Sequence, residues 1–216
     1  MSKKQDPVSR SPARIYFELA TVLLVGIGKF VVGDWFRQKF AFVVVGCGLL
    51  IAFIAIRGLQ HPSVLKEWGF TKNNFAASMK RIAPFAVLSM LGFFLYGAKT
   101  LHAFVDWHIW AVFFLYPVWG IIQQFLVAVL LAGNLDRLSG GRIPRPVIVL
   151  TTAALFALVH VPSLPLVLAA FALGCVTTAS FLRYRNVWTI GIFHGWFATF
   201  LYFFVLGFDP LQDLLS

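Results

Sequence analysis

The chain has 216 residues, of which 60% are hydrophobic and only 12% are charged, whereas an ordinary soluble domain has roughly 25% charged residues. This small number of charged side chains cannot cover the surface of a water-soluble fold of this length. The composition therefore excludes a soluble globular protein and predicts an integral membrane protein. The net charge of +10 does not indicate nucleic-acid binding, because the basic residues lie in short segments between apolar runs and do not cluster on one face of a folded domain.

Apolar runs of about 20 residues are long enough to cross the hydrocarbon core as helices. Such runs are predicted at residues 15–33, 40–57, 82–98, 107–132, 147–162, 164–182 and 187–207. The fifth run is short and is closed by Pro162 and Pro165, so we expect it to form a tight hairpin with the sixth. The predicted fold is an all-α, polytopic transmembrane bundle of about seven helices, within a range of six to eight, that forms a single domain over residues 1–216.

Lys and Arg residues are concentrated in alternate loops. Fourteen of them lie in the amino-terminal tail and the even-numbered loops, against three in the odd-numbered loops. By the positive-inside rule, the basic tail of residues 1–14 is expected in the cytoplasm and the carboxyl terminus on the other side. The first apolar run lacks a cleavage pattern and is expected to remain as a helix. We therefore expect a multi-pass protein of the plasma membrane of a prokaryote.

Three features outside the apolar cores have simple interpretations. Residues 63–82 alternate apolar and basic side chains, which predicts a segment on the anionic membrane surface, with a solvated loop as the alternative. Glu18 and Lys29 lie near opposite ends of the first helix and are expected to extend toward the membrane surfaces. The loop after the third run carries residues that could ligate a metal but that are more simply a solvated turn: His102, Asp106 and His108.

Four polar side chains lie inside the later apolar runs, namely Gln123, Gln124, His160 and His194. Polar groups in hydrocarbon are costly and are therefore functional candidates. Each lies on a helix face suited to a neighbouring helix, beside small or aromatic residues that would support the site: Phe156, Gly191, Gly195 and Ala198. Interhelical hydrogen bonding explains any one of them, but four such groups on three helices favour one convergent polar site.

These residues form an ordered set of motifs. A polar pair in Trp119–Leu126 is followed by Phe-x-x-x-His at 156–160 and by His-Gly-Trp-Phe-Ala at 194–198. The set resembles the CAAX protease and bacteriocin-processing (CPBP, or Abi) family of intramembrane endopeptidases. The resemblance covers roughly residues 110–207, the CPBP-like core, and the Trp-Gly-Phe stretch at 68–70 is similar to the segment that precedes the family's core.

The resemblance implies hydrolysis of peptide bonds in membrane-associated proteins or peptides, with a glutamate that activates water and with histidines and a polar residue that stabilise the oxyanion. The chain departs from this pattern. The family's Glu-Glu-x-x-x-Arg motif has glutamines at both acidic positions and Ala128 in place of the arginine, and the last polar position of the third motif is Ala198. An amide cannot accept a proton from water near neutral pH, and general-base catalysis is worth ~10²–10⁴-fold.

Two interpretations of the site follow. In the first, His160 or His194 is the base, and Gln123 and Gln124 orient water and substrate. In the second, the chain is a pseudoprotease that binds membrane peptides or partners without cutting them. No cofactor is expected: two histidines and two amides lack the carboxylates or thiolates usual for zinc. Zinc, a bis-histidine haem site and a transporter, whose typical inverted repeats are not visible, are kept as lesser alternatives.

Overall fold

The computed structural model describes residues 12–100 and 107–215, and these residues form helices and turns without a strand. Most of the predicted basic tail of residues 1–14, together with His102 and Asp106, lies outside the described residues. The all-helical fold confirms the predicted fold class. The single-domain assignment stays a prediction.

The first half of the described chain forms one helical hairpin and one long separate helix. Helix α1 spans Pro12–Gly28 and continues as a π-helical segment over Lys29–Trp35, and α2 spans Lys39–Gln60. A short helix, α3, spans Ser63–Glu67 and leads into α4 over Phe75–Thr100. These bounds contain the first three predicted helices.

The second half contains the predicted core. Helix α5 over His108–Gln124 continues through a π-helical segment, Phe125–Ala132, into α6 over Gly133–Ser139. Helix α7 spans Arg145–Leu158 and α8 spans Leu164–Tyr184. Helix α9 spans Val187–Leu201 and ends in a π-helical segment, Tyr202–Leu206, before the short α10 over Pro210–Leu215.

Within the described ranges, six helices are long and apolar enough to cross a membrane, and α7 is a seventh, shorter apolar helix. Large hydrophobic side chains are exposed along these helices, for example Leu24, Leu49, Leu88 and Phe114. A surface of this kind is stable only in lipid, so the chain is an integral membrane protein. The 14 residues of α7 advance about 21 Å, against about 30 Å of hydrocarbon, so α7 alone is too short to cross the membrane.

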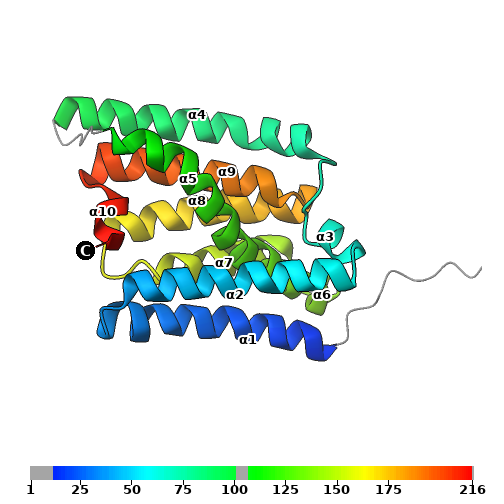
Figure 1. Cartoon of the computed structure of the whole chain (residues 1–216). Helices are drawn as coiled ribbons and strands as arrows, with labels where there is room; N and C mark the ends of the chain where they lie inside the picture. Colours follow the sequence, from blue (N-terminus) through cyan, green and yellow to red (C-terminus); the bar gives the residue numbers. More distant parts are fainter. Residues whose placement is uncertain (1–11, 101–106, 216) are drawn as a thin grey trace, which may run out of the picture.

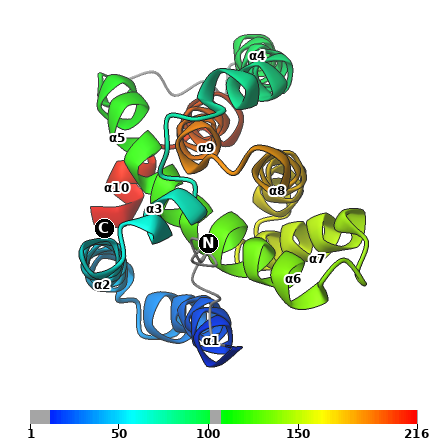
Figure 2. The same ribbon diagram turned by 90° about the vertical axis from the view of Figure 1, so that its right-hand side faces the viewer.

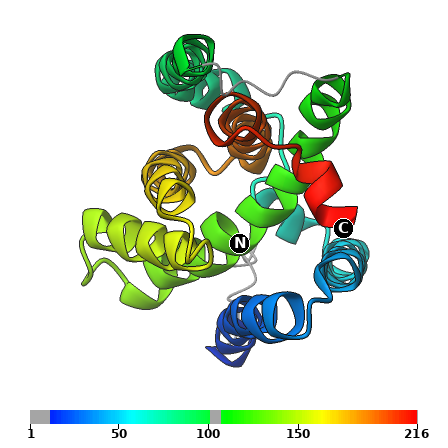
Figure 3. The same cartoon turned by 90° about the vertical axis from the view of Figure 1, so that its left-hand side faces the viewer.

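Helix α9 lies at the centre of the bundle, and Figures 2 and 3 show α4, α5 and α8 grouped around it, with the α1–α2 hairpin at the periphery. In the candidate span of α9, 67% of the residues are buried, against 11% for α1 and 6% for α2. Helix α7 packs on α8. The core therefore consists of the carboxyl-terminal half of the chain, which is the region that carries the polar residues.

The basic segments gather at one end of the bundle. The start of α1, helix α3, the α6–α7 turn and the α8–α9 turn lie at the right-hand end in Figure 1, and the α1–α2 turn and α10 lie at the left-hand end. This arrangement agrees with the alternation of basic and non-basic loops. That the basic end faces the cytoplasm stays a prediction.

The segment around α3 is more deeply buried than expected. Val64 and Trp68 are buried in the core, where the Trp68 indole packs edge-on against Phe125 at 5.0 Å. The prediction of a membrane-surface segment is therefore wrong for this part of residues 63–82, because the stretch folds back onto the π-helical segment after α5. The backbone carbonyl of Gly69 accepts a hydrogen bond from the amide of Val187, which ties the stretch to the start of α9.

Glu18 does not extend to the membrane surface. Its side chain is fully buried, and its carboxylate pairs with Arg14 at 3.0 Å and accepts a hydrogen bond from Asn134 at 2.7 Å. The expectation for Glu18 is wrong because α6 offers it a buried polar partner. Lys29 pairs instead with Asp34 at 2.6 Å on a partly exposed surface.

Candidate active site

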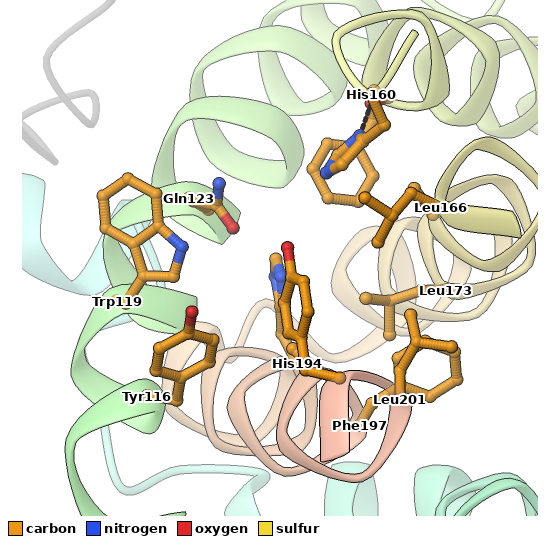
Figure 4. A pocket seen from close by; sticks show the side chains of 13 residues that line it. Tyr116, Trp119, Gln123, His160, Leu166, Leu173, His194, Phe197 and Leu201 are labelled. Atoms are coloured by element: carbon orange, nitrogen blue, oxygen red, sulfur yellow. Dashed lines mark hydrogen bonds between the residues drawn. The ribbon is translucent and has the colours of Figure 1, made fainter. Parts of the chain in front are cut away.

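A small cavity lies between α5, α9 and the α7–α8 hairpin. Figure 4 shows Gln123 from α5, His160 from the turn after α7 and His194 from α9 around it. Phe156 and Ala198 also line the cavity. Three of the four predicted polar residues thus reach one space from three separate helical elements, although 71 residues separate Gln123 from His194 in the sequence.

The fourth residue, Gln124, lies directly behind His194. Its side chain is completely buried, and its Nε2 lies 3.1 Å from Nδ1 of His194, which is also buried. With the amide placed so that its NH₂ group faces the ring, Nδ1 of His194 accepts this bond, and the amide oxygen of Gln124 is buried without a hydrogen-bond partner among the described residues. A neutral imidazole carries one proton. His194 therefore carries it on Nε2, which makes that nitrogen a hydrogen-bond donor.

His160 is held in the opposite tautomer. Its Nδ1 lies 2.9 Å from the backbone carbonyl oxygen of Phe156. A carbonyl oxygen only accepts, so Nδ1 carries the proton and Nε2 is left with a free lone pair. Figure 4 shows the imidazole of His160 at the cavity, with this hydrogen bond on its far side. The cavity thus has one imidazole that accepts a proton and one that donates a hydrogen bond.

Phe156 contacts both imidazoles. Its ring lies edge-on to both of them, with the ring centroids 5.1 Å from His160 and 5.6 Å from His194. The ring is buried and cannot compete for hydrogen bonds. It therefore packs against both imidazoles without forming a hydrogen bond to either.

The two predicted supporting glycines act through the backbone. A Cβ atom at Gly191 would lie 2.6 Å from Cα of Ile121, and one at Gly195 would lie 2.6 Å from Cα of Pro117. Carbon atoms in contact are normally about 3.5–4.0 Å apart. Helices α5 and α9 thus approach as closely as they do only because these positions have no side chain, and this approach is what brings Gln124 to His194.

The cavity has room for water but for little else. Its volume is about 50 Å³, and one water needs roughly 10–15 Å³ of such space. It therefore holds about three to five waters. In the described part of the chain, no three His, Cys, Asp or Glu side chains lie together in a way that could hold a metal ion. The expectation that no cofactor is needed stays a prediction.

Several lining residues were not among the predicted site residues. Tyr116 and Trp119 on α5, and Tyr202 after α9, bring a polar atom each to a wall that is otherwise formed by apolar side chains, namely Leu166, Ala170, Leu173, Phe197 and Leu201. The spacing of four residues from His194 through Ala198 to Tyr202 could have indicated the last of the three. The leucines of α8 carry no comparable signal in the sequence.

The first residue of α5, His108, belongs to another predicted feature. Nδ1 of His108 lies 2.6 Å from the carboxylate of Asp209, which is buried at the start of α10. His108 is therefore not part of a simple solvated turn. With His102 and Asp106 outside the described residues, metal binding by this group stays untested.

Comparison with known proteins adds one finding. Residues 104–200 match the family model described as type II CAAX prenyl endopeptidase Rce1-like. No curated protein and no solved structure matches the chain significantly. The matched residues contain all four polar residues and most of the predicted core of 110–207. The resemblance to the CAAX protease and bacteriocin-processing family is thus confirmed over this region.

Proposed function

We propose that this chain, whose residues 104–200 are Rce1-like, is an intramembrane endopeptidase that uses a histidine in place of a glutamate as its general base. The observation that carries the proposal is the pair of opposite tautomers. His160 presents a lone pair and His194 presents an N–H to one water-sized cavity. These are the two groups that hydrolysis of a peptide bond requires besides water.

In this mechanism, Nε2 of His160 takes a proton from a water molecule while the oxygen of that water forms a bond to the scissile carbonyl carbon. The carbonyl oxygen becomes an oxyanion and accepts a hydrogen bond from Nε2–H of His194. When the C–N bond breaks, His160 returns the proton to the leaving amine. Base catalysis is worth ~10²–10⁴-fold, and one oxyanion donor is worth ~10²–10³-fold in kcat.

The two glutamines have different roles in this proposal. Gln123 lines the cavity, so its amide orients the attacking water or the substrate by hydrogen bonds. Gln124 does not line it, but its bond to Nδ1 keeps the proton of His194 on Nε2. Gln124 is thus a positioning residue, and neither amide needs to accept a proton.

The substrate class follows from the location of the cavity. The cavity is surrounded by membrane helices and has apolar walls on α8 and α9, so the peptide that reaches it belongs to a membrane-associated protein or is itself membrane-bound. A volume of about 50 Å³ does not hold a peptide, so binding has to widen it. The basic end of the bundle is proposed to face the cytoplasm of a prokaryotic cell, by the positive-inside rule.

A pseudoprotease is the second candidate, and the amides at 123 and 124 favour it because they lack the acidic groups of the family's first motif. Such a protein would bind the same membrane peptides without cutting them. The same assay separates the two candidates.

The test uses the purified full-length protein in liposomes and a pool of quenched-fluorescent peptides that carry a palmitoyl anchor. We expect cleavage by the natural sequence and a loss of at least about 100-fold in both His160→Ala and His194→Ala, the lower end of the range for such groups. His61→Ala is the matched control, because His61 is exposed at the end of α2. Full cleavage by His160→Ala would overturn the proposal, and peptide binding without cleavage by the natural sequence would establish a pseudoprotease.

A further inference from the structure

The cavity contains a tyrosine hydroxyl whose position relative to His194 is set by the helix. His194, Ala198 and Tyr202 follow one another at intervals of four residues along α9, and all three line the cavity. Residues four apart lie on the same face of a helix. The three side chains therefore form one row along the cavity wall.

The small side chain in the middle of the row leaves space for the large one that follows. Side chains on a helix lean toward its amino terminus, a direction that for Tyr202 leads over the turn that carries Ala198 to the cavity that both Tyr202 and His194 line. One turn of helix is about 5.4 Å long, which is comparable to the reach of a tyrosine. A polar side chain at position 198, which the third motif of the family has, would occupy the same space.

The Tyr202 ring is held by its aromatic neighbours. It packs edge-on against Tyr116 of α5, with the ring centroids 6.2 Å apart, and against Phe208, at 5.1 Å. These contacts orient the ring but do not use its hydroxyl, and no side chain in the described part of the chain accepts a hydrogen bond from it. A hydroxyl beside the cavity that no described side chain engages is available to bind what enters the cavity.

We propose that the hydroxyl of Tyr202 is a second donor to the oxyanion, and that it supplies from one turn further along α9 the hydrogen bond that Ala198 cannot give. This inference rests on the proposed function. The O–H of Tyr202 and the Nε2–H of His194 then approach the same oxygen from positions about two turns apart on one helical face. A pre-organised pair of donors of this kind stabilises the charge that develops in the transition state.

The test is Tyr202→Phe, which keeps the aromatic ring and its contacts and removes only the hydroxyl. With the best-cleaved peptide of the anchored pool, we expect kcat to fall by about 100-fold, as for loss of one oxyanion donor, while KM changes by less than about threefold because the ground-state carbonyl binds weakly. Tyr96→Phe is the matched control, since Tyr96 is exposed on α4. A large fall in kcat with little change in KM distinguishes a catalytic role of the hydroxyl from a structural one.

A second variant tests the geometric part of the inference. In Tyr202→Phe, the additional change Ala198→Asn places an amide donor one turn closer to His194, in space that the lost hydroxyl no longer needs. We expect this double variant to recover at least about tenfold of the lost kcat, a fraction of the range for one donor. A kcat of Tyr202→Phe equal to that of Tyr96→Phe would overturn the inference, as would a failure of Ala198→Asn to restore any activity.

The two proposals fail in different ways. If the natural sequence cleaves and His160→Ala does not, but Tyr202→Phe is fully active, the endopeptidase assignment stands and the role of Tyr202 is wrong. If His160→Ala cleaves as well as the natural sequence, or if the natural sequence does not cleave, the proposed function is wrong and the role of Tyr202 is rejected with it.

Discussion

A methyl group added at position 195 should force α5 and α9 apart. The Cβ of an alanine there would lie 2.5 Å from the carbonyl carbon of Tyr116 and 2.6 Å from Cα of Pro117, whereas carbon atoms in contact are about 3.5–4.0 Å apart. Because both obstacles are backbone, a rotamer change cannot relieve the overlap. The two helices must separate by about 1 Å to restore ordinary contact.

A separation of that size would break the hydrogen bond behind the site. Nε2 of Gln124 and Nδ1 of His194 are 3.1 Å apart, already near the upper end of the range of about 2.7–3.2 Å for such bonds. Overpacking costs about 1–3 kcal/mol, and loss of the bond costs about 0.5–1.5 kcal/mol. Gly195→Ala should therefore lower the free energy of unfolding by about 1.5–4.5 kcal/mol.

The assay is thermal unfolding in detergent, followed by tryptophan fluorescence, with peptide cleavage measured on the same preparations. Gly92→Ala is the matched control, because a Cβ at Gly92 on α4 meets no atom within 4 Å. This control should be neutral or stabilising by up to about 1 kcal/mol, since alanine favours a helix over glycine. If Gly195→Ala proved as stable and as active as Gly92→Ala, the close approach of α5 and α9 could not be what assembles the site.

Three other substitutions test separate parts of the account. Ala170→Leu places a larger apolar side chain in the cavity wall and should reduce cleavage at least tenfold, with a loss of stability of no more than about 1–3 kcal/mol; unchanged cleavage would mean that the reaction occurs elsewhere. Glu18→Gln removes a buried charge that holds α1 to α6 and should destabilise the protein by about 1.5–3 kcal/mol. Its control, Asp34→Asn, changes a partly exposed ion pair and should cost about 0–1 kcal/mol. Equal melting temperatures of the two variants would contradict the structural role of Glu18. Ser78→Ala removes a buried hydroxyl that contacts Ser180 of α8 at 3.1 Å and Thr189 of α9 at 2.6 Å, and should lower the free energy of unfolding by about 1–3 kcal/mol. Its control is Ser89→Ala, because the Ser89 hydroxyl donates to the carbonyl oxygen of Ala86 in the same helix. This control should have little effect on the unfolding temperature.

The helices themselves could be predicted from the sequence because the bilayer imposes a length on each apolar run. The rule also holds for the short apolar run at 147–162: Pro162 ends this run early, and the structure has the 14-residue helix α7 there. An apolar run does not reveal which other helices or segments pack against it. The sequence therefore predicts a membrane-surface position for Trp68 and Glu18, although the fold buries both.

The candidate site could be predicted in part, for a similar reason. Polar residues in apolar helices are conspicuous because they are costly in hydrocarbon, and this signal is what singled out His160 and His194. Tyr202 is not conspicuous in this way, since a tyrosine is ordinary near a helix end and its role depends on the direction in which its ring leans. The tautomers likewise depend on which atoms lie within hydrogen-bond distance, and only the folded structure supplies those.

The central claim is that the two imidazoles at the cavity are held in opposite tautomers. Solid-state ¹⁵N NMR of histidine-labelled protein in lipid bilayers measures this directly, with His160→Ala and His194→Ala used to assign the signals. The account predicts a proton on Nδ1 of His160 and on Nε2 of His194, and a change at His194 alone in Gln124→Met, which removes the donor to Nδ1. The same tautomer at both residues, or an unchanged His194 signal in Gln124→Met, would contradict it.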